Sequence, residues 1–178
     1  MTETDNPPRA FALPFDSPDE WAELFENFGK NGRTMQDFTN LSPESMEVFY
    51  MVAFNQYNAG HYEESSKIFQ LLASLNHFDK RFWMGLGSSR SMEGKHEDAI
   101  KAFGYLYFLD MKDPAPTFHC ARSLMALGKV PEAEAGLRAT IATAEGKPEH
   151  ADLKAQAETM LELLQQGQKE ITAAISQP

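Results

Sequence analysis

Cysteine and long apolar runs are scarce in this chain. Cys120 is the only cysteine among 178 residues, so no disulfide can form within the chain, which favours a reducing compartment. Residues 1–9 are polar and lack the apolar core of a secretory signal. No segment approaches the ~18 consecutive apolar residues that a membrane-spanning helix needs. We therefore expect a cytoplasmic protein that does not insert into a membrane.

An excess of positive charge is also missing. The chain has a net charge of −10, with 16 Lys and Arg against 26 Asp and Glu. Residues 1–40 carry eight acids and three bases, residues 148–178 carry five and two, and residues 46–147 are nearly neutral with twelve and eleven. Because the sequence has no basic stripe and no basic amphipathic helix, we expect neither nucleic acid nor an anionic membrane as a partner.

The residue patterns of common active sites are absent as well. The five histidines show no metal-ligand spacing, and no second cysteine could complete a zinc site. Gly85-Leu86-Gly87 is followed by Arg90 where a dinucleotide loop needs a third glycine. Cys120 takes a position at which the helical pattern predicts an inert core residue. We expect no enzyme, no metal and no cofactor.

What the chain does have is a glycine turn that recurs every 34 residues, at Gly60, Gly94 and Gly128. Trp83, followed by Leu86-Gly87 and then by Gly94, is the pattern with which a tetratricopeptide repeat begins. The period predicts an all-α protein in which three tandem repeats, each a pair of antiparallel helices, stack in a right-handed superhelix over residues 46–147. The predicted repeats are residues 46–79, 80–113 and 114–147.

Corresponding positions of the three repeats predict the core. Small residues at Ala53, Gly87 and Ala121 would let the two helices of a pair approach closely. In the second helices, residues three or four apart form a stripe that we expect to be buried. This stripe includes Phe69, Phe103 and Leu137, and in the first helices we expect Phe49, Val52 and Leu86 to be core residues.

The segments outside the repeats are predicted to cap the stack, because a repeat stack exposes apolar surface at both ends. Residues 1–16 have no periodicity and are expected to form a flexible arm. Residues 17–45 are expected to form an N-terminal helical cap, in which Ser17-Pro18 starts a helix and a short second helix with Met35 and Phe38 follows. Ser42-Pro43 then starts a new helix by the same signal as Ser17-Pro18. Residues 148–167 are expected to form a C-terminal capping helix, followed by a flexible tail over residues 168–178. The N-terminal helix places four apolar residues on one face: Trp21, Leu24, Phe25 and Phe28.

The first helices of tetratricopeptide repeats line the concave face of the stack, so their inward positions predict a binding groove. Those positions are rich in aromatic residues and methionine and hold few charges, a composition that suits an extended apolar segment of a partner. Two alternatives stay open: the rings could be buried core, and Arg122 could contact either a partner or a neighbouring acid. The groove residues that we single out are Tyr50, Phe54, Tyr57, Met84, Ser88, Phe118, Arg122 and Met125.

Several motifs, taken together, resemble one family. Ala53-Phe54-Asn55-Gln56-Tyr57 is followed by Gly60-His61-Tyr62, then by the stretch from Leu75 to Phe82, and then by Gly85-Leu86-Gly87. In this order, and over about residues 44–145, the motifs resemble the class II chaperones of bacterial type III secretion.

The resemblance implies a non-enzymatic bacterial chaperone of the cytoplasm. Its partners would be the two hydrophobic, pore-forming translocator proteins, major and minor, which it would keep soluble before secretion. An extended segment near the translocator N-terminus would lie in the groove, and the family's pattern adds Tyr62 and Leu75 to the groove residues. Because the family often dimerises through its N-terminal helices, the four apolar residues of the predicted N-terminal helix would form a homodimer interface. A tetratricopeptide adaptor that assembles proteins of another pathway is the alternative function.

Overall fold

The computed structural model describes residues 32–39 and 41–175 of the chain, which separates into two units, Met1–Leu41 and Ser42–Pro178. In the first unit, the described residues form a short 3-10 helix, η1 (Met35–Phe38). At its start the backbone N–H of Thr34 donates a hydrogen bond to Asp37 Oδ2 over 2.6 Å. The predicted N-terminal helix, with its face of Trp21, Leu24, Phe25 and Phe28, lies outside the described residues.

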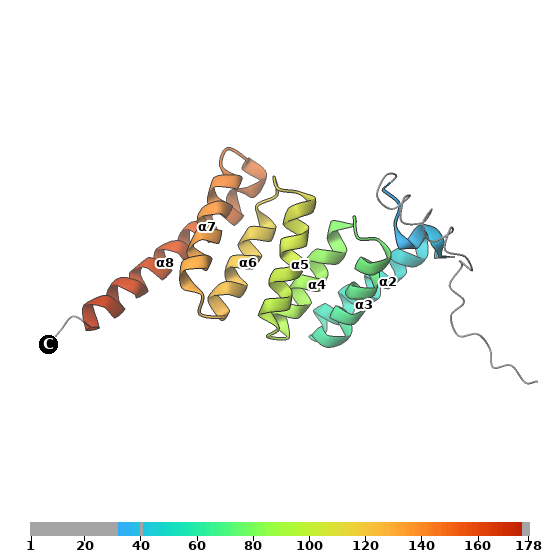
Figure 1. The fold of residues 1–178 in the computed structure, drawn as a ribbon, viewed down its shortest axis with the longest axis horizontal. Coiled ribbons are helices and arrows are strands. Elements are labelled where there is room, and N and C mark those ends of the chain that lie inside the picture. The colour runs from blue at the N-terminus through green and yellow to red at the C-terminus, as the bar shows by residue number, and fades with distance from the viewer. Residues whose placement is uncertain (1–31, 40, 176–178) are drawn as a thin grey trace, which may run out of the picture. The chain divides into compact units, whose positions relative to one another are not determined.

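The second unit consists of helices and their connections over its described residues, which confirms the all-α prediction. Each α-helix packs against the next one along the chain (Figure 1), so that α2 to α7 form three helical pairs and α8 follows against α7. The helices are α2 (Pro43–Asn58), α3 (Tyr62–Leu75), α4 (Lys80–Met92), α5 (His96–Leu109), α6 (Ala115–Ala126), α7 (Val130–Ala144), the 3-10 helix η2 (Pro148–His150) and α8 (Ala151–Ile175).

Local signals in the sequence set the helix ends. Helix α2 begins at Pro43, and the backbone N–H of Ser45 donates a hydrogen bond to Ser42 Oγ over 3.2 Å, so Ser42 is the cap that the sequence predicts. The turn from α4 to α5 passes through Gly94, whose φ is +77°, a left-handed conformation that favours glycine. The N–H of the following Lys95 donates to the carbonyl of Arg90 over 2.9 Å and closes the end of α4.

The predicted stripe of the second helices forms the core. Phe69, Phe103 and Leu137 are 2%, 1% and 0% exposed. A side chain at Gly87 would place its Cβ 2.5 Å from Cε1 of Phe103, so the absence of a side chain there is what lets α4 and α5 approach. The expected role of Gly87 as a close-packing position is confirmed.

Two predicted core residues are wrong. Phe49 and Val52 in α2 are 39% and 41% exposed, whereas Leu86, which holds the position of Val52 in the next repeat, is 8% exposed. Helix α3 precedes α4 and packs against it, but no helix of the second unit precedes α2. The same repeat position is therefore buried inside the row and exposed at its first helix.

The last helix is longer than the predicted cap over residues 148–167. Helix α8 continues to Ile175, through much of the segment expected to be a flexible tail. Its side chains reach the preceding pair: Ala157 lies in one buried cluster with Leu137, and Gln165 Nε2 donates to Glu134 Oε1 over 2.9 Å. These contacts lie within the predicted cap and hold it against the preceding pair, whereas across residue 167 the helix has its own hydrogen bond from Gln166 Nε2 to Glu170 Oε1, over 3.0 Å.

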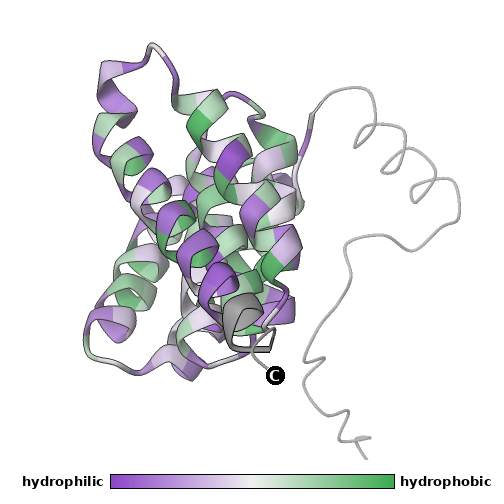
Figure 2. Cartoon of the chain, turned by 90° about the vertical axis from the view of Figure 1, so that its left-hand side faces the viewer, coloured by the Kyte–Doolittle hydropathy of each residue, from purple (hydrophilic) through white to green (hydrophobic). Residues whose placement is uncertain are grey.

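Figure 2 shows hydrophilic and hydrophobic residues interspersed along the helices. In keeping with this pattern, none of the helices formed by the described residues is long and apolar enough to cross a membrane.

Candidate functional site

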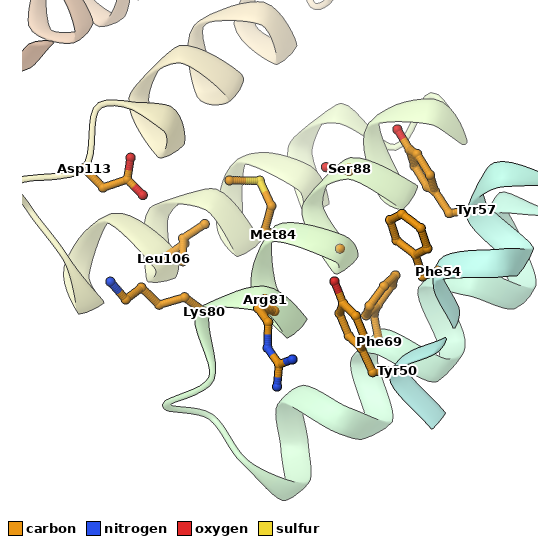
Figure 3. Close-up of a pocket in the computed structure, with 11 residues that line it drawn as sticks. Tyr50, Phe54, Tyr57, Phe69, Lys80, Arg81, Met84, Ser88, Leu106 and Asp113 are labelled. Carbon is orange, nitrogen blue, oxygen red and sulfur yellow. The ribbon is translucent and has the colours of Figure 1, made fainter. Parts of the chain in front are cut away.

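A cleft of about 330 Å³ lies between the first helices of the first two repeats, α2 and α4, and we call it the α2–α4 cleft (Figure 3). The side chains of α2 and α4 supply most of its walls, and α3, α5 and the α5–α6 connection contribute the rest. The lining residues are Tyr50, Phe54, Tyr57, Phe69, Lys80, Arg81, Met84, Gly85, Ser88, Leu106 and Asp113.

Aromatic rings line the α2 side of the cleft. The ring centroids of Tyr50 and Phe54 are 6.2 Å apart in a stacked arrangement, and Tyr50 meets Phe69 edge-on at 5.9 Å. Phe54 nevertheless stays 43% exposed, so much of its apolar surface is open to a partner. On the α4 side, a side chain at Gly85 would collide with the ring of Phe69, so the glycine allows this buried ring to pack directly against α4 beneath the cleft.

Two cations stand at the rim, and each is paired with acids of the chain. Arg81 Nη2 lies 2.6 Å from Glu47 Oε1 and 2.7 Å from Asp79 Oδ2, and its guanidinium carbon lies 4.9 Å from the ring centroid of Tyr50. Hydrogen bonds to Asp79 and Glu47 raise the pKa of Arg81 above its usual value. Arg81 is therefore held over the aromatic wall and remains charged.

The rim carries an excess of acids. Lys80 Nζ pairs with Asp110 Oδ2 over 2.7 Å, and this hydrogen bond raises the pKa of Lys80. Asp113 lines the cleft beside Lys80, with its Oδ1 accepting a hydrogen bond from the N–H of Ala115 over 2.9 Å. The rim thus has two cations and four carboxylates, which are those of Glu47, Asp79, Asp110 and Asp113. The cleft is apolar inside and slightly acidic at its edge.

The structure brings half of the sequence-predicted groove residues together in this cleft: Tyr50, Phe54, Tyr57, Met84 and Ser88. Tyr62 is not among the lining residues, but its ring meets that of Tyr57 edge-on at 5.4 Å and so supports the α2 wall. Leu75 lies half-buried at the end of α3, outside the lining set.

The other three predicted groove residues lie on α6 in a different environment. Phe118 is 3% exposed and shares a buried cluster with Leu137 and Ala157, against which Met125 also packs. The ring that we expected in an open groove is thus mainly part of the core, because α8 covers this part of α6. Arg122 is exposed, and its guanidinium carbon lies 6.0 Å from the centroid of Phe118.

A second cavity, of about 540 Å³, opens between α6 and α8, and we call it the α6–α8 hollow. Phe118 and Arg122 line it from α6, and residues of α8 line it from the other side. The sequence pattern does not identify the α8 residues as part of a site, because only the packing of α8 across α6 makes them part of this surface. They are Ala155, Gln156, Thr159 and Met160.

Sequence reasoning also missed part of the α2–α4 cleft. Phe69 was expected only as core, and Leu106 and Asp113 come from α5 and the connection that follows it. The inward positions of the first helices cannot predict these three residues, because the residues reach the cleft from α3, α5 and the α5–α6 connection.

Nothing in the described residues forms a metal site or an activated nucleophile. No group of three or more His, Cys, Asp or Glu side chains among them could hold a metal ion. Burial raises the pKa of the Cys120 thiol to about 11, so at neutral pH it is almost entirely the unreactive thiol. The thiol also donates a weak hydrogen bond to the carbonyl of Ile100, at 3.8 Å.

Known proteins resemble this chain in sequence and in fold. The sequence model of the tetratricopeptide repeat matches residues 92–157. Low calcium response locus protein H of Yersinia pseudotuberculosis is 37% identical over 145 residues, which are 82% of this chain and 86% of that protein.

Two solved structures are similar in fold as well as in sequence. A type III secretion complex from Aeromonas hydrophila has a TM-score of 0.76 and 36% identity, covering 83% of this chain and 98% of that one. The type III secretion chaperone SycD of Yersinia enterocolitica, in complex with a peptide of the translocator YopD, has a TM-score of 0.68 and 37% identity, covering 73% and 99%.

Proposed function

Because the chain belongs to the family of type III secretion translocator chaperones, we propose that it binds the major and minor translocators of its own secretion system and keeps them soluble in the cytoplasm before secretion. In this proposal an extended segment near the translocator N-terminus lies in the α2–α4 cleft, with apolar side chains inserted among the rings. The chain acts by binding alone and needs no cofactor.

The observation that carries this proposal is the exposed aromatic wall of the cleft. Phe54 is 43% exposed although it sits in a row of rings, and Met84 and Ser88 face it from α4 (Figure 3). Aromatic side chains give a large contact area at low entropic cost, and methionine adapts to varied partners. A few such anchors in a pocket can supply most of the binding energy of an extended segment.

A co-expression experiment tests the proposal. The chain carries an affinity tag, and an untagged hydrophobic translocator is produced with it. Light scattering of the purified product measures the solubility and stoichiometry of the complex. The same measurement on the chain purified alone gives its oligomeric state. We expect a soluble complex with the wild-type chain. Phe54→Ala combined with Tyr57→Ala should abolish the complex without changing helical content, because the substitutions remove the open part of the wall.

A matched control is available on α5. Tyr107 and Phe108 are 39% and 69% exposed and line neither cavity, so Tyr107→Ala combined with Phe108→Ala removes the same two ring types outside the cleft. This control should retain the complex. A translocator that binds the Phe54/Tyr57 variant as well as the wild type would show that the cleft is not its site. A translocator that precipitates beside soluble wild-type chain would favour the adaptor function instead.

A further inference from the structure

The α6–α8 hollow continues the face on which the α2–α4 cleft lies. Helix α2 contacts α4, α4 contacts α6, and α6 contacts α8, so these four helices form one continuous row. The cleft is built on the first two of them and the hollow on the last two. A partner segment that leaves the cleft along this row therefore meets the hollow.

The two cavities differ in charge. The cations of the cleft, Lys80 and Arg81, are each paired with an acid of the chain. Arg122 forms no such ion pair within the part of the chain that the structure describes, and none of the other residues that line the hollow is charged. The hollow thus offers one exposed guanidinium beside apolar surface from Met160 and Ala155, and the buried ring of Phe118 lies behind it.

The neighbouring histidine leaves this charge unchanged near neutral pH. His119 stacks on Phe103 with ring centroids 5.1 Å apart, and its burial, assisted by the charge of Arg122, lowers the pKa of His119 to about 4. The imidazole is therefore neutral at pH 7, and Arg122 supplies the positive charge of the hollow by itself.

We propose that the α6–α8 hollow is a second subsite for the translocator segment, where Arg122 pairs with an Asp or Glu of that segment and Met160 and Ala155 contact an apolar side chain next to it. This inference rests on the proposed function, because it concerns the same partner. Gln156 and Thr159 complete the subsite as uncharged polar groups able to hydrogen-bond to the carboxylate or to the segment's backbone.

The row of helices also sets a spacing. With neighbouring helices about 10 Å apart and an extended chain rising about 3.3 Å per residue, a segment spans the two helix steps between cleft and hollow with about six residues. The acid should therefore lie about six residues from the apolar side chains that occupy the cleft.

A selection with a defined probe tests the subsite. A library of random 16-residue peptides displayed on phage, each able to extend over about 50 Å, is selected against the full-length chain, and the enriched sequences are aligned on their apolar anchors. Wild type should enrich Asp or Glu at one fixed distance from the anchors. Arg122→Gln should lose this preference, and Arg122→Glu should replace it with Lys or Arg. Removing the acid from a selected peptide should weaken its binding to wild type by about five-fold, the upper range for an exposed ion pair.

Arg138→Gln is the matched control for Arg122→Gln, since Arg138 is an exposed arginine of α7 that lines neither cavity. It should leave the acidic preference in place. If wild type and Arg122→Glu enrich the same charges, the subsite is refuted while the enriched apolar anchors still support the cleft. If the anchors themselves are absent, or survive Phe54→Ala combined with Tyr57→Ala, the proposed function fails at the cleft.

Discussion

At the scale of single residues, Gly87 and Gly104 occupy contrasting places in the α4–α5 pair. A Cβ at Gly87 would lie 2.5 Å from Phe103, whereas a Cβ at Gly104 would meet nothing within 4 Å. We predict that Gly87→Ala lowers the free energy of unfolding by about 1–3 kcal/mol, the usual cost of overpacking a core. Gly104→Ala should raise it by up to about 1 kcal/mol, because alanine is the better helix former. Urea unfolding of both variants measures the difference, and equal effects would contradict the packing described for Gly87.

The free energy of unfolding should depend on pH through His119. Because its pKa is lowered to about 4 in the folded chain, from about 6.5 when unfolded, the unfolded chain takes up a proton first as the pH falls. The stabilising contribution is therefore complete above pH 6.5 and is lost as the pH falls towards 4.

The pH effect of His119 can be isolated by substitution. Between pH 7.5 and pH 5 the wild-type free energy of unfolding should fall by about 2 kcal/mol more than that of His119→Phe, which keeps a ring against Phe103 but cannot be protonated. Because both proteins share all other titrating groups, the difference between their urea midpoints at the two pH values reports on His119. Parallel losses in the two proteins would rule out a buried, neutral imidazole.

At the scale of elements, α8 acts as the cap of the helix row. It covers a cluster in which Phe118 and Leu137 are 3% and 0% exposed, and its own Ala157 is fully buried there. A chain that stops after Lys147 should lose about 3 kcal/mol or more, because burial of one large apolar side chain is worth about 1.5–3 kcal/mol, and it should aggregate through the uncovered cluster.

A shorter truncation provides the control for α8. Stopping after Gly167 keeps the cluster and the hydrogen bond of Gln165 to Glu134, and it should cost less than about 1 kcal/mol. Thermal unfolding and light scattering compare the two truncated chains with the full length. If both truncations behave alike, α8 does not stabilise the row through this cluster.

At the scale of the whole molecule, binding should couple to stability. A segment that binds only the folded chain, at a free concentration about 100-fold above its Kd, stabilises it by about 2.7 kcal/mol. For a chain of this length that corresponds to a rise in Tm of about 5–10 °C. Thermal melts over a series of concentrations of a purified translocator segment measure the effect. The Tm of the Phe54/Tyr57 double alanine variant should not rise. If the wild-type Tm does not change with the concentration of the segment, binding to the folded chain is contradicted.

Local patterns in the sequence account for the parts of this protein that repeat. The 34-residue period predicts three helical pairs, the buried stripe of Phe69, Phe103 and Leu137, and a groove lined by Tyr50, Phe54 and Met84. These features are local or nearly so: helical spacing sets which side chains share a face, and the repeat gives equivalent positions the same neighbours.

Packing between helices sets where the repeats stop being equivalent. Val52 and Leu86 hold the same repeat position, yet Val52 is 41% exposed and Leu86 is 8% exposed, because within the second unit α3 precedes and covers α4, whereas α2 is the first described helix. In the same way, α8 turns Phe118 into a core residue and gives Arg122 a hollow to line, and α5 and its connection bring Leu106 and Asp113 to the cleft. These outcomes depend on contacts between residues far apart in the chain, and a pattern of neighbouring residues does not encode such contacts.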